Sequence, residues 1–225
     1  MYLANKLHKE MDILMPPVNF IGKTFTYSQL SKVLNKLVKP FGAKARVVKD
    51  IDIGIISKKR EIFEFSGYFD TGDNSIGITA HLDNKKNTIT FTKAKYNKFR
   101  FLLSQTIQHE FIHKSQFTFR PEQAERTIVV YHSDRISGHR LDAIDYYREW
   151  CEVEAYAHNI AMEINYHYSN LNPNTIIKNI DKYRNLTSYK RYKNAFAGTD
   201  WSRVKTSLLK KTWKWLSSAH APKKI

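Results

Sequence analysis

Two histidines and a glutamate lie at a spacing that suits metal chemistry. Residues 109–113 read His-Glu-Phe-Ile-His, and on an α-helix side chains four positions apart project from nearly the same face. His109 and His113 could therefore grip one zinc ion, while Glu110 reaches a zinc-bound water as general base. Zinc lowers the pKa of such a water toward neutrality. The order of these residue types indicates hydrolysis of an amide bond.

The segment that must position these side chains is predicted to be a helix over 98–117. It contains no proline or glycine, and its apolar residues recur at helical spacing. Pro121 lies just beyond it, where a helix would be expected to have ended. Phe111 and Ile112 are apolar as well, and a helix that is apolar nearly all round is usually central and buried. We expect the metal-binding helix to lie in the interior.

A third protein ligand should complete the site. A metzincin would need glycine and histidine where this chain has Gln116 and Phe119, so that class is excluded. A second predicted helix over 141–168 supplies two glutamates instead. Glu154 lies at the edge of its apolar face, where a carboxylate is costly unless paired or metal-bound, whereas Glu152 points to the far side. We predict Glu154 as the third zinc ligand, with Glu152 as the second choice.

This pair of motifs resembles a known family. His-Glu-Phe-Ile-His, followed some forty residues later by Glu-Val-Glu-Ala-Tyr-Ala-His, is similar to the small gluzincins of the minigluzincin type, and most of all to zincin-like proteins encoded by phages. In these proteins HExxH on one helix is completed by a glutamate in an ExxA pattern on the next helix. Glu154 with Ala157 fits the pattern, and so does Glu152 with Ala155.

The resemblance covers residues 60–168 and implies roles for the site residues. It implies that His109, His113 and the downstream glutamate bind Zn²⁺, and that Glu110 is the general base of a metallopeptidase. It also implies a zincin-like fold, in which an edge strand runs beside the metal helix.

Alternating apolar and polar residues predict a sheet before the metal helix. The alternation runs through 61–69, 75–82 and 87–92, with turn-forming clusters between the runs, and 45–56 is a candidate for an earlier strand. We expect these strands to form a meander. Residues 76–82 are the candidate for the edge strand that would hold a substrate backbone by strand addition.

The two ends of the chain are predicted to be helical. Local signals for helix starts and stops recur there. We expect helices over 2–15, 27–38 and 201–217, and a further helix that starts at Asn172. The helix over 27–38 would begin with a capping box at Thr26 and Gln29.

These elements predict an α+β fold, and the resemblance implies that it is of the zincin type. A small, largely antiparallel sheet within 45–93 would be followed by the two metal-carrying helices. The expected division is an N-terminal helical segment over 1–44, a catalytic core over 45–170, and a basic helical extension over 171–225.

The loop over 118–140 offers candidates for stabilising the oxyanion of the transition state. Tyrosine and histidine side chains often donate the hydrogen bond that this requires. Tyr131 and His132 are such candidates.

Composition narrows the remaining possibilities. The single Cys151 of the 225-residue chain excludes an intrachain disulfide framework and a thiolate zinc cluster. No apolar run is long enough to span a membrane, and residues 1–20 lack a signal-peptide core. We expect a soluble protein that is cytoplasmic or virion-associated.

The chain is strongly basic, with a net charge of +16 and a pI near 9.8. Lys and Arg alternate with aromatic residues over 182–214, a composition that suits nucleic acid or another polyanion.

Three classes of function follow from these features. A zinc metalloendopeptidase acting on a protein or peptide is the first, because a purely structural zinc site needs no general base such as Glu110. The second is a structural or virion component with a zincin fold and little activity. The third is a basic nucleic-acid-binding protein in which zinc only stabilises the fold.

Overall fold

The structure is a computed structural model. It describes residues 2–49, 63–72, 74–82, 88–120, 122, 140–197 and 201–217. The chain forms two compact units, Met1–Phe111 and Ile112–Ile225. The boundary falls inside one long helix, α4 (Lys93–Phe119). The architecture is mixed α+β, as the sequence predicts: most of the described elements are helices, and all of the described strands lie in the first unit.

Local signals set the helices at the start of the first unit. Helix α1 (Tyr2–Leu14) ends before Pro16, and the short α2 (Pro17–Phe20) begins on a proline. Helix α3 (Tyr27–Val38) starts with the predicted capping box between Thr26 and Gln29. Its Thr26 side chain accepts from the Gln29 amide at 3.2 Å, and the Gln29 side chain accepts from the Thr26 amide at 2.8 Å. A 3₁₀ turn, η1 (Lys39–Phe41), follows it.

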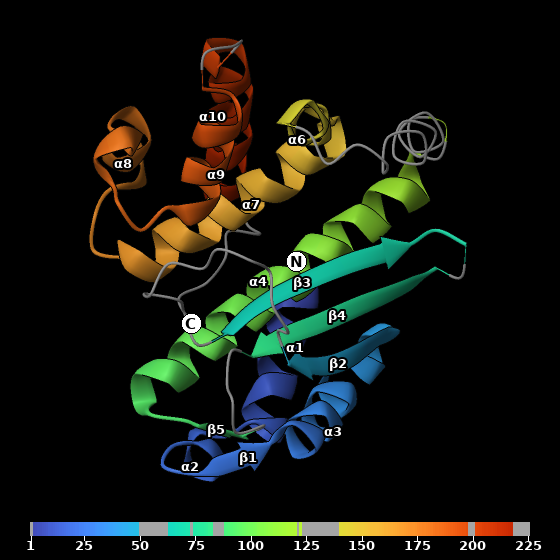
Figure 1. The fold of residues 1–225 in the computed structure, drawn as a ribbon. Coiled ribbons are helices and arrows are strands. Elements are labelled where there is room, and N and C mark those ends of the chain that lie inside the picture. Colours follow the sequence, from blue (N-terminus) through green and yellow to red (C-terminus); the bar gives the residue numbers. More distant parts are fainter. Residues whose placement is uncertain are drawn as a thin grey trace. The chain divides into compact units, whose positions relative to one another are not determined.

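The strands of the first unit form two small sheets (Figure 1). Strand β1 (Thr24–Thr26) pairs antiparallel with β5 (Thr88–Thr90). The larger sheet has the order β2-β4-β3, where β2 (Ala43–Lys49) runs parallel and β3 (Phe63–Asp70) antiparallel to β4 (Ser75–Leu82). The predicted sheet region is therefore confirmed in position, although one of its pairings is parallel.

Two predictions about the sheet are wrong. The strands do not form a meander, because β2 and β3 lie on opposite edges of β4 and β5 pairs elsewhere. Residues 76–82 belong to the central strand, and β2 and β3 are the two edge strands of this sheet among the described residues. The physical reason is burial: β4 turns Ile76, Ile78 and Ala80 into the core, so an apolar strand is paired on both sides.

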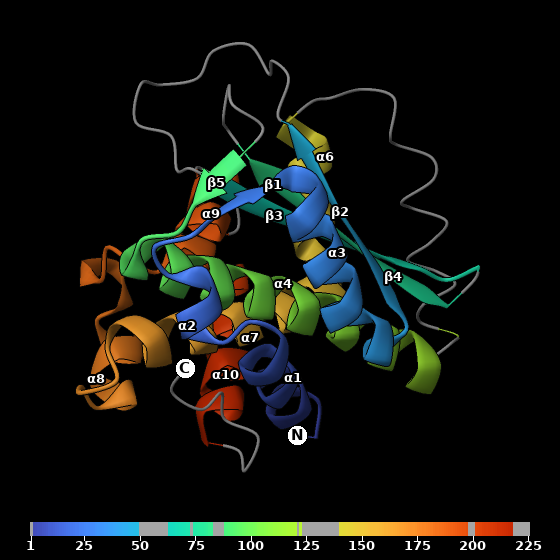
Figure 2. The same ribbon diagram turned by 90° about the horizontal axis from the view of Figure 1, so that it is seen from below.

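The core of the first unit lies between the sheet and the helices. Helix α3 packs along β2, as the view from below shows (Figure 2). Helix α4 begins after Thr92, whose hydroxyl accepts from the Lys95 amide at 3.2 Å. Its Phe99 ring packs against Phe65 of β3 and against Phe91, with ring centroids 5.0 and 5.1 Å apart. These aromatic contacts fix the first part of α4 against β3.

The second unit is helical throughout its described residues. The predicted helix over 141–168 is two helices, α6 (Arg140–Arg148) and α7 (Trp150–His167), which are separated at Glu149. Two shorter elements follow, α8 (Pro173–Lys178) and the 3₁₀ turn η2 (Ile180–Lys182). Helix α9 (Thr187–Ala195) was not predicted, whereas α10 (Trp201–Ser217) matches its prediction.

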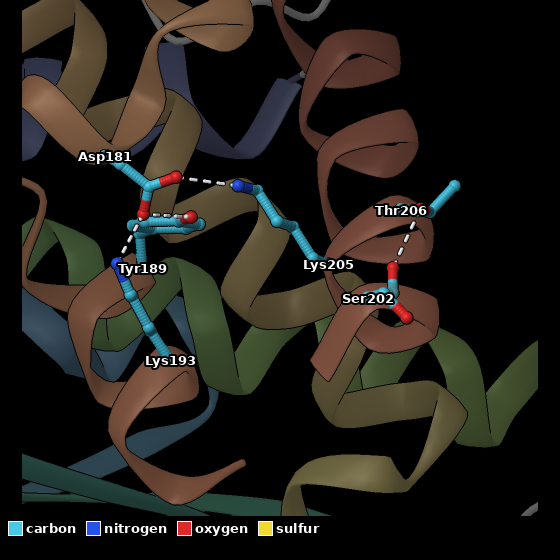
Figure 3. A network of polar contacts seen from close by, with 6 residues as sticks. All are labelled: Asp181, Tyr189, Lys193, Ser202, Lys205 and Thr206. Atoms are coloured by element: carbon cyan, nitrogen blue, oxygen red, sulfur yellow. Dashed lines mark hydrogen bonds and ion pairs between the residues drawn. The ribbon is translucent and has the colours of Figure 1, made fainter. Parts of the chain in front are cut away.

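Two carboxylates join the helices of the second unit. Glu163 of α7 is 1 % exposed and accepts from the hydroxyl groups of Thr187 and Ser188 and from the Ser188 amide, at the N-terminus of α9. Asp181 of η2 lies 2.7 Å from both Lys193 of α9 and Lys205 of α10 (Figure 3). Residues from four elements are thereby held together.

None of the helices within the described ranges is long and apolar enough to cross a membrane. The expected division at residues 44 and 170 stays a prediction. The loop candidates Tyr131 and His132 lie outside the described residues.

Candidate metal centre

The residues of the HExxH motif lie on α4, as predicted, and all three are buried. His109 and His113 are each 7 % exposed, and Glu110 is 5 % exposed. The helix continues without interruption from Lys93 to Phe119, so the two imidazoles are one turn apart on the same side. The geometry that the sequence predicts for these two ligands is present.

A glutamate of α7 lies beside the second histidine. Nε2 of His113 is 3.3 Å from Oε1 of Glu152. His109, His113 and Glu152 each have one potential ligand atom that lies within 4.8 Å of the other two. Among the residues that the structure describes, this is the only group of three side chains that could hold a metal ion in this way. The structure therefore brings together two histidines and Glu152.

The expectation that Glu152 points away from the buried side is wrong, because this residue is 3 % exposed. From Cys151 to Ile164, α7 is buried at every position except Glu154. A helix that is enclosed on nearly all sides has no solvent side to which a second carboxylate could be assigned.

Gln116 orients the imidazole of His113. Its side-chain nitrogen lies 3.3 Å from both the Cys151 carbonyl and Oε2 of Glu154, two acceptors. Its oxygen therefore faces His113, with Oε1 at 3.1 Å from Nδ1. When Nδ1 donates this hydrogen bond, the neutral imidazole has its lone pair on Nε2, the nitrogen that faces Glu152. This is the orienting contact that a metal-binding histidine usually has.

Glu154 has a different neighbourhood from the one expected of the third ligand. Its side chain is 25 % exposed and lies 3.9 Å from Nζ of Lys211 on α10. It contacts His113 only through Gln116. Glu154 is thus separated from the group of three by the side chain of Gln116. Its role as a zinc ligand stays a prediction, and this arrangement does not favour it.

Glu110 occupies space against the edge strand β3. A Cβ atom added to Gly67 would lie 2.6 Å from both Cγ and Oε1 of Glu110. Such a distance is far inside van der Waals contact, so only glycine at this position leaves room for the carboxylate. The strand backbone and the carboxylate are therefore immediate neighbours.

The buried Cys151 is close to the centre but is no ligand in this group. Burial raises the pKa of its thiol, and a hydrogen bond with His113 acts in the opposite direction. The thiol is therefore neutral near pH 7, as is usual for a buried cysteine that takes part in packing.

Two residues of the site were missed in the sequence. Gln116 was used only to exclude a metzincin, although its position three residues after His113 places it on the same helix face. Gly67 has no local signal for its contact with Glu110, because the two residues meet only through the tertiary fold.

A comparison of the chain with protein-family models, with characterised proteins and with solved structures finds no match.

Proposed function

We propose that this protein is a zinc-dependent metallopeptidase of the zincin type. One observation carries the proposal: His109, His113 and Glu152 form a buried group with ligand atoms within 4.8 Å, next to the buried Glu110. Buried imidazoles and a carboxylate at such distances are costly unless they share a proton or a cation.

The donor set fits zinc in a catalytic rather than a structural role. Two imidazole nitrogens and one carboxylate oxygen are the ligands of many hydrolytic zinc sites, which keep the fourth position open. Structural zinc sites are usually closed by four protein ligands rich in cysteine. Cys151 is the only cysteine in the chain, so a thiolate-rich site is excluded.

Glu110 is the proposed general base. Zinc bound by these residues would supply a water of lowered pKa. The role of Glu110 would be to accept the proton that hydrolysis removes from water and to deliver it to the nitrogen of the leaving amine. Burial of Glu110 against β3 limits the positions that its carboxylate can adopt, which favours proton transfer from one defined place.

Strand β3 is the proposed docking edge for the substrate backbone. It lies at the edge of the sheet among the described strands, and its Gly67 contacts Glu110. A peptide that adds to this edge as an extra strand would bring its carbonyl groups near the general base. This replaces residues 76–82, which were expected in this role.

The test compares the wild type with Glu110→Gln on a mixed peptide library, with cleavage followed by mass spectrometry. We expect cleavage by the wild type that a chelator abolishes, and a loss of about 10²-fold or more in Glu110→Gln. The variant should keep its zinc, because the amide preserves the shape of the side chain.

Comparable cleavage by Glu110→Gln would contradict the mechanism. A zinc-loaded wild type that cleaves no peptide would instead support the structural or virion component as the function.

A further inference from the structure

Helix α10 in the second unit has an unusual charge composition. Its seventeen residues include five cations and no acidic residue. The structure divides these cations into two sets with different surroundings.

The inner cations have carboxylate partners. Lys205 lies 2.7 Å from Asp181 (Figure 3). Lys211 lies 3.9 Å from Glu154. The outer cations Arg203, Lys210 and Lys214 are exposed, and none of them has an ion pair within the described ranges. The inner set stabilises the helix packing, and the outer set is available to a partner.

The outer cations lie nearly in line along the helix. They are separated by seven and by four residues, so they share one face. At 1.5 Å per residue their Cα atoms are spaced by about 10 and about 6 Å along the axis. We name this surface the α10 outer face; its exposed residues are Arg203, Thr206, Ser207, Lys210, Trp213, Lys214 and Ser217.

An indole lies among these cations. Trp213 is 38 % exposed. The other tryptophans have partners for their rings: Trp215 packs on the His158 ring and Trp201 on the Tyr189 ring, and the Arg120 guanidinium lies over Trp150. No ring contact involves Trp213 among the residues that the structure describes. It is an aromatic side chain next to Lys214 and one turn from Lys210 that is not used for packing against another ring.

We propose that the α10 outer face binds single-stranded nucleic acid. Unpaired cations in a line suit consecutive phosphates, and an exposed aromatic ring beside them offers a stacking platform for a base. Hydroxyl groups of Ser207 and Ser217 lie on the same face. A lipid surface would call for a broad apolar face, whereas this face has one aromatic residue among polar ones.

The test measures binding of a fluorescent single-stranded oligonucleotide by anisotropy over a range of salt concentrations. The variant Arg203→Gln/Lys210→Gln/Lys214→Gln should lower the slope of log affinity against log salt by about two, since each phosphate contact on a single strand contributes about 0.7. The matched control Lys23→Gln/Lys32→Gln/Lys36→Gln removes the same charge from exposed lysines of the first unit and should change the slope little.

Stacking is tested by Trp213→Leu. We expect its affinity for the single strand to fall by about tenfold, and its affinity for heparin, a polyanion without bases, to stay unchanged. Circular dichroism should show every variant folded.

The proposal is overturned if the α10 variant binds the oligonucleotide like the wild type. It is also overturned if Trp213→Leu has no effect, or if heparin, duplex DNA or anionic vesicles bind as tightly as the single strand. In those cases the charge serves another partner.

Discussion

Gln116 decides which nitrogen of His113 is available to a metal. Its amide nitrogen donates hydrogen bonds to the Cys151 carbonyl and to Glu154, so its oxygen is the atom that accepts a hydrogen bond from Nδ1 of His113. Such orienting contacts typically change metal affinity by about 10- to 100-fold. Glu154 thus helps to orient Gln116 by accepting a hydrogen bond from it, although Glu154 does not itself contact the histidines.

Gly67→Ala should impair catalysis without loss of zinc. The added methyl group would meet the Glu110 carboxylate at 2.6 Å, so the general base must move away from its present place. If the proposed peptidase activity is observed, kcat should fall by about tenfold or more, because misplacing a catalytic group by about 1 Å has effects of this size or larger. Zinc content and KM should change little.

Gly77→Ala is the matched control for this variant. Its added methyl group would meet the Tyr68 ring on the opposite face of the same sheet, and Tyr68 is 57 % exposed and can move. If both variants lose activity together, the effect comes from the sheet and the positioning role of Gly67 is contradicted.

The elements of the fold differ in how well the sequence predicts them. Helix α3 and α10 could be placed because caps, prolines and apolar periodicity are local signals. The pairing of β2 with β4 could not, because a parallel pair forms between distant segments and leaves no turn to recognise.

Helix α7 shows why the third ligand was misjudged. Periodicity separates a buried side from a solvent side, and Glu152 was assigned to the solvent side. In the structure α7 is buried from Cys151 to Ile164 except at Glu154, so the sequence pattern assigned the two glutamates to the wrong sides. The tertiary fold buries Glu152 beside His113 and leaves Glu154 partly exposed beside Lys211.

The contact of η2 with α9 and α10 should make stability depend on pH. Hydrogen bonds from Lys193 and Lys205 hold the pKa of Asp181 well below its ordinary value. A lowered pKa in the folded state stabilises the protein above the unfolded pKa of about 4, and this stabilisation is lost as pH falls further. Asp181 is 42 % exposed, so its two ion pairs together should contribute only about 1 kcal/mol.

Thermal unfolding of Asp181→Asn measures this contribution. The melting temperature of the variant should lie below that of the wild type by the same difference from about pH 8 to about 5. This difference in melting temperature should shrink below about pH 4. Asp145→Asn removes an exposed carboxylate that has no ion pair among the described residues and should melt like the wild type. A margin that stays constant down to about pH 2 would show that the ion pairs are not its cause.

Charge is distributed unevenly over the whole molecule. Residues 171–225 contain 13 of the 37 basic residues and only two of the 21 acidic ones. The sequence alone predicts this basic extension, but it does not show which cations are used internally. That division depends on Asp181 and Glu154, which meet Lys205 and Lys211 only in the folded second unit.

The central claim for the molecule is a zinc site made by His109, His113 and Glu152, and its most direct test is the zinc content of matched variants. Glu152→Gln and Glu154→Gln change neighbouring glutamates of α7 in the same way and preserve side-chain volume. Elemental analysis should find one zinc per chain in the wild type and in Glu154→Gln, and almost none in Glu152→Gln. A wild type without zinc, or zinc kept by Glu152→Gln and lost by Glu154→Gln, would contradict the account.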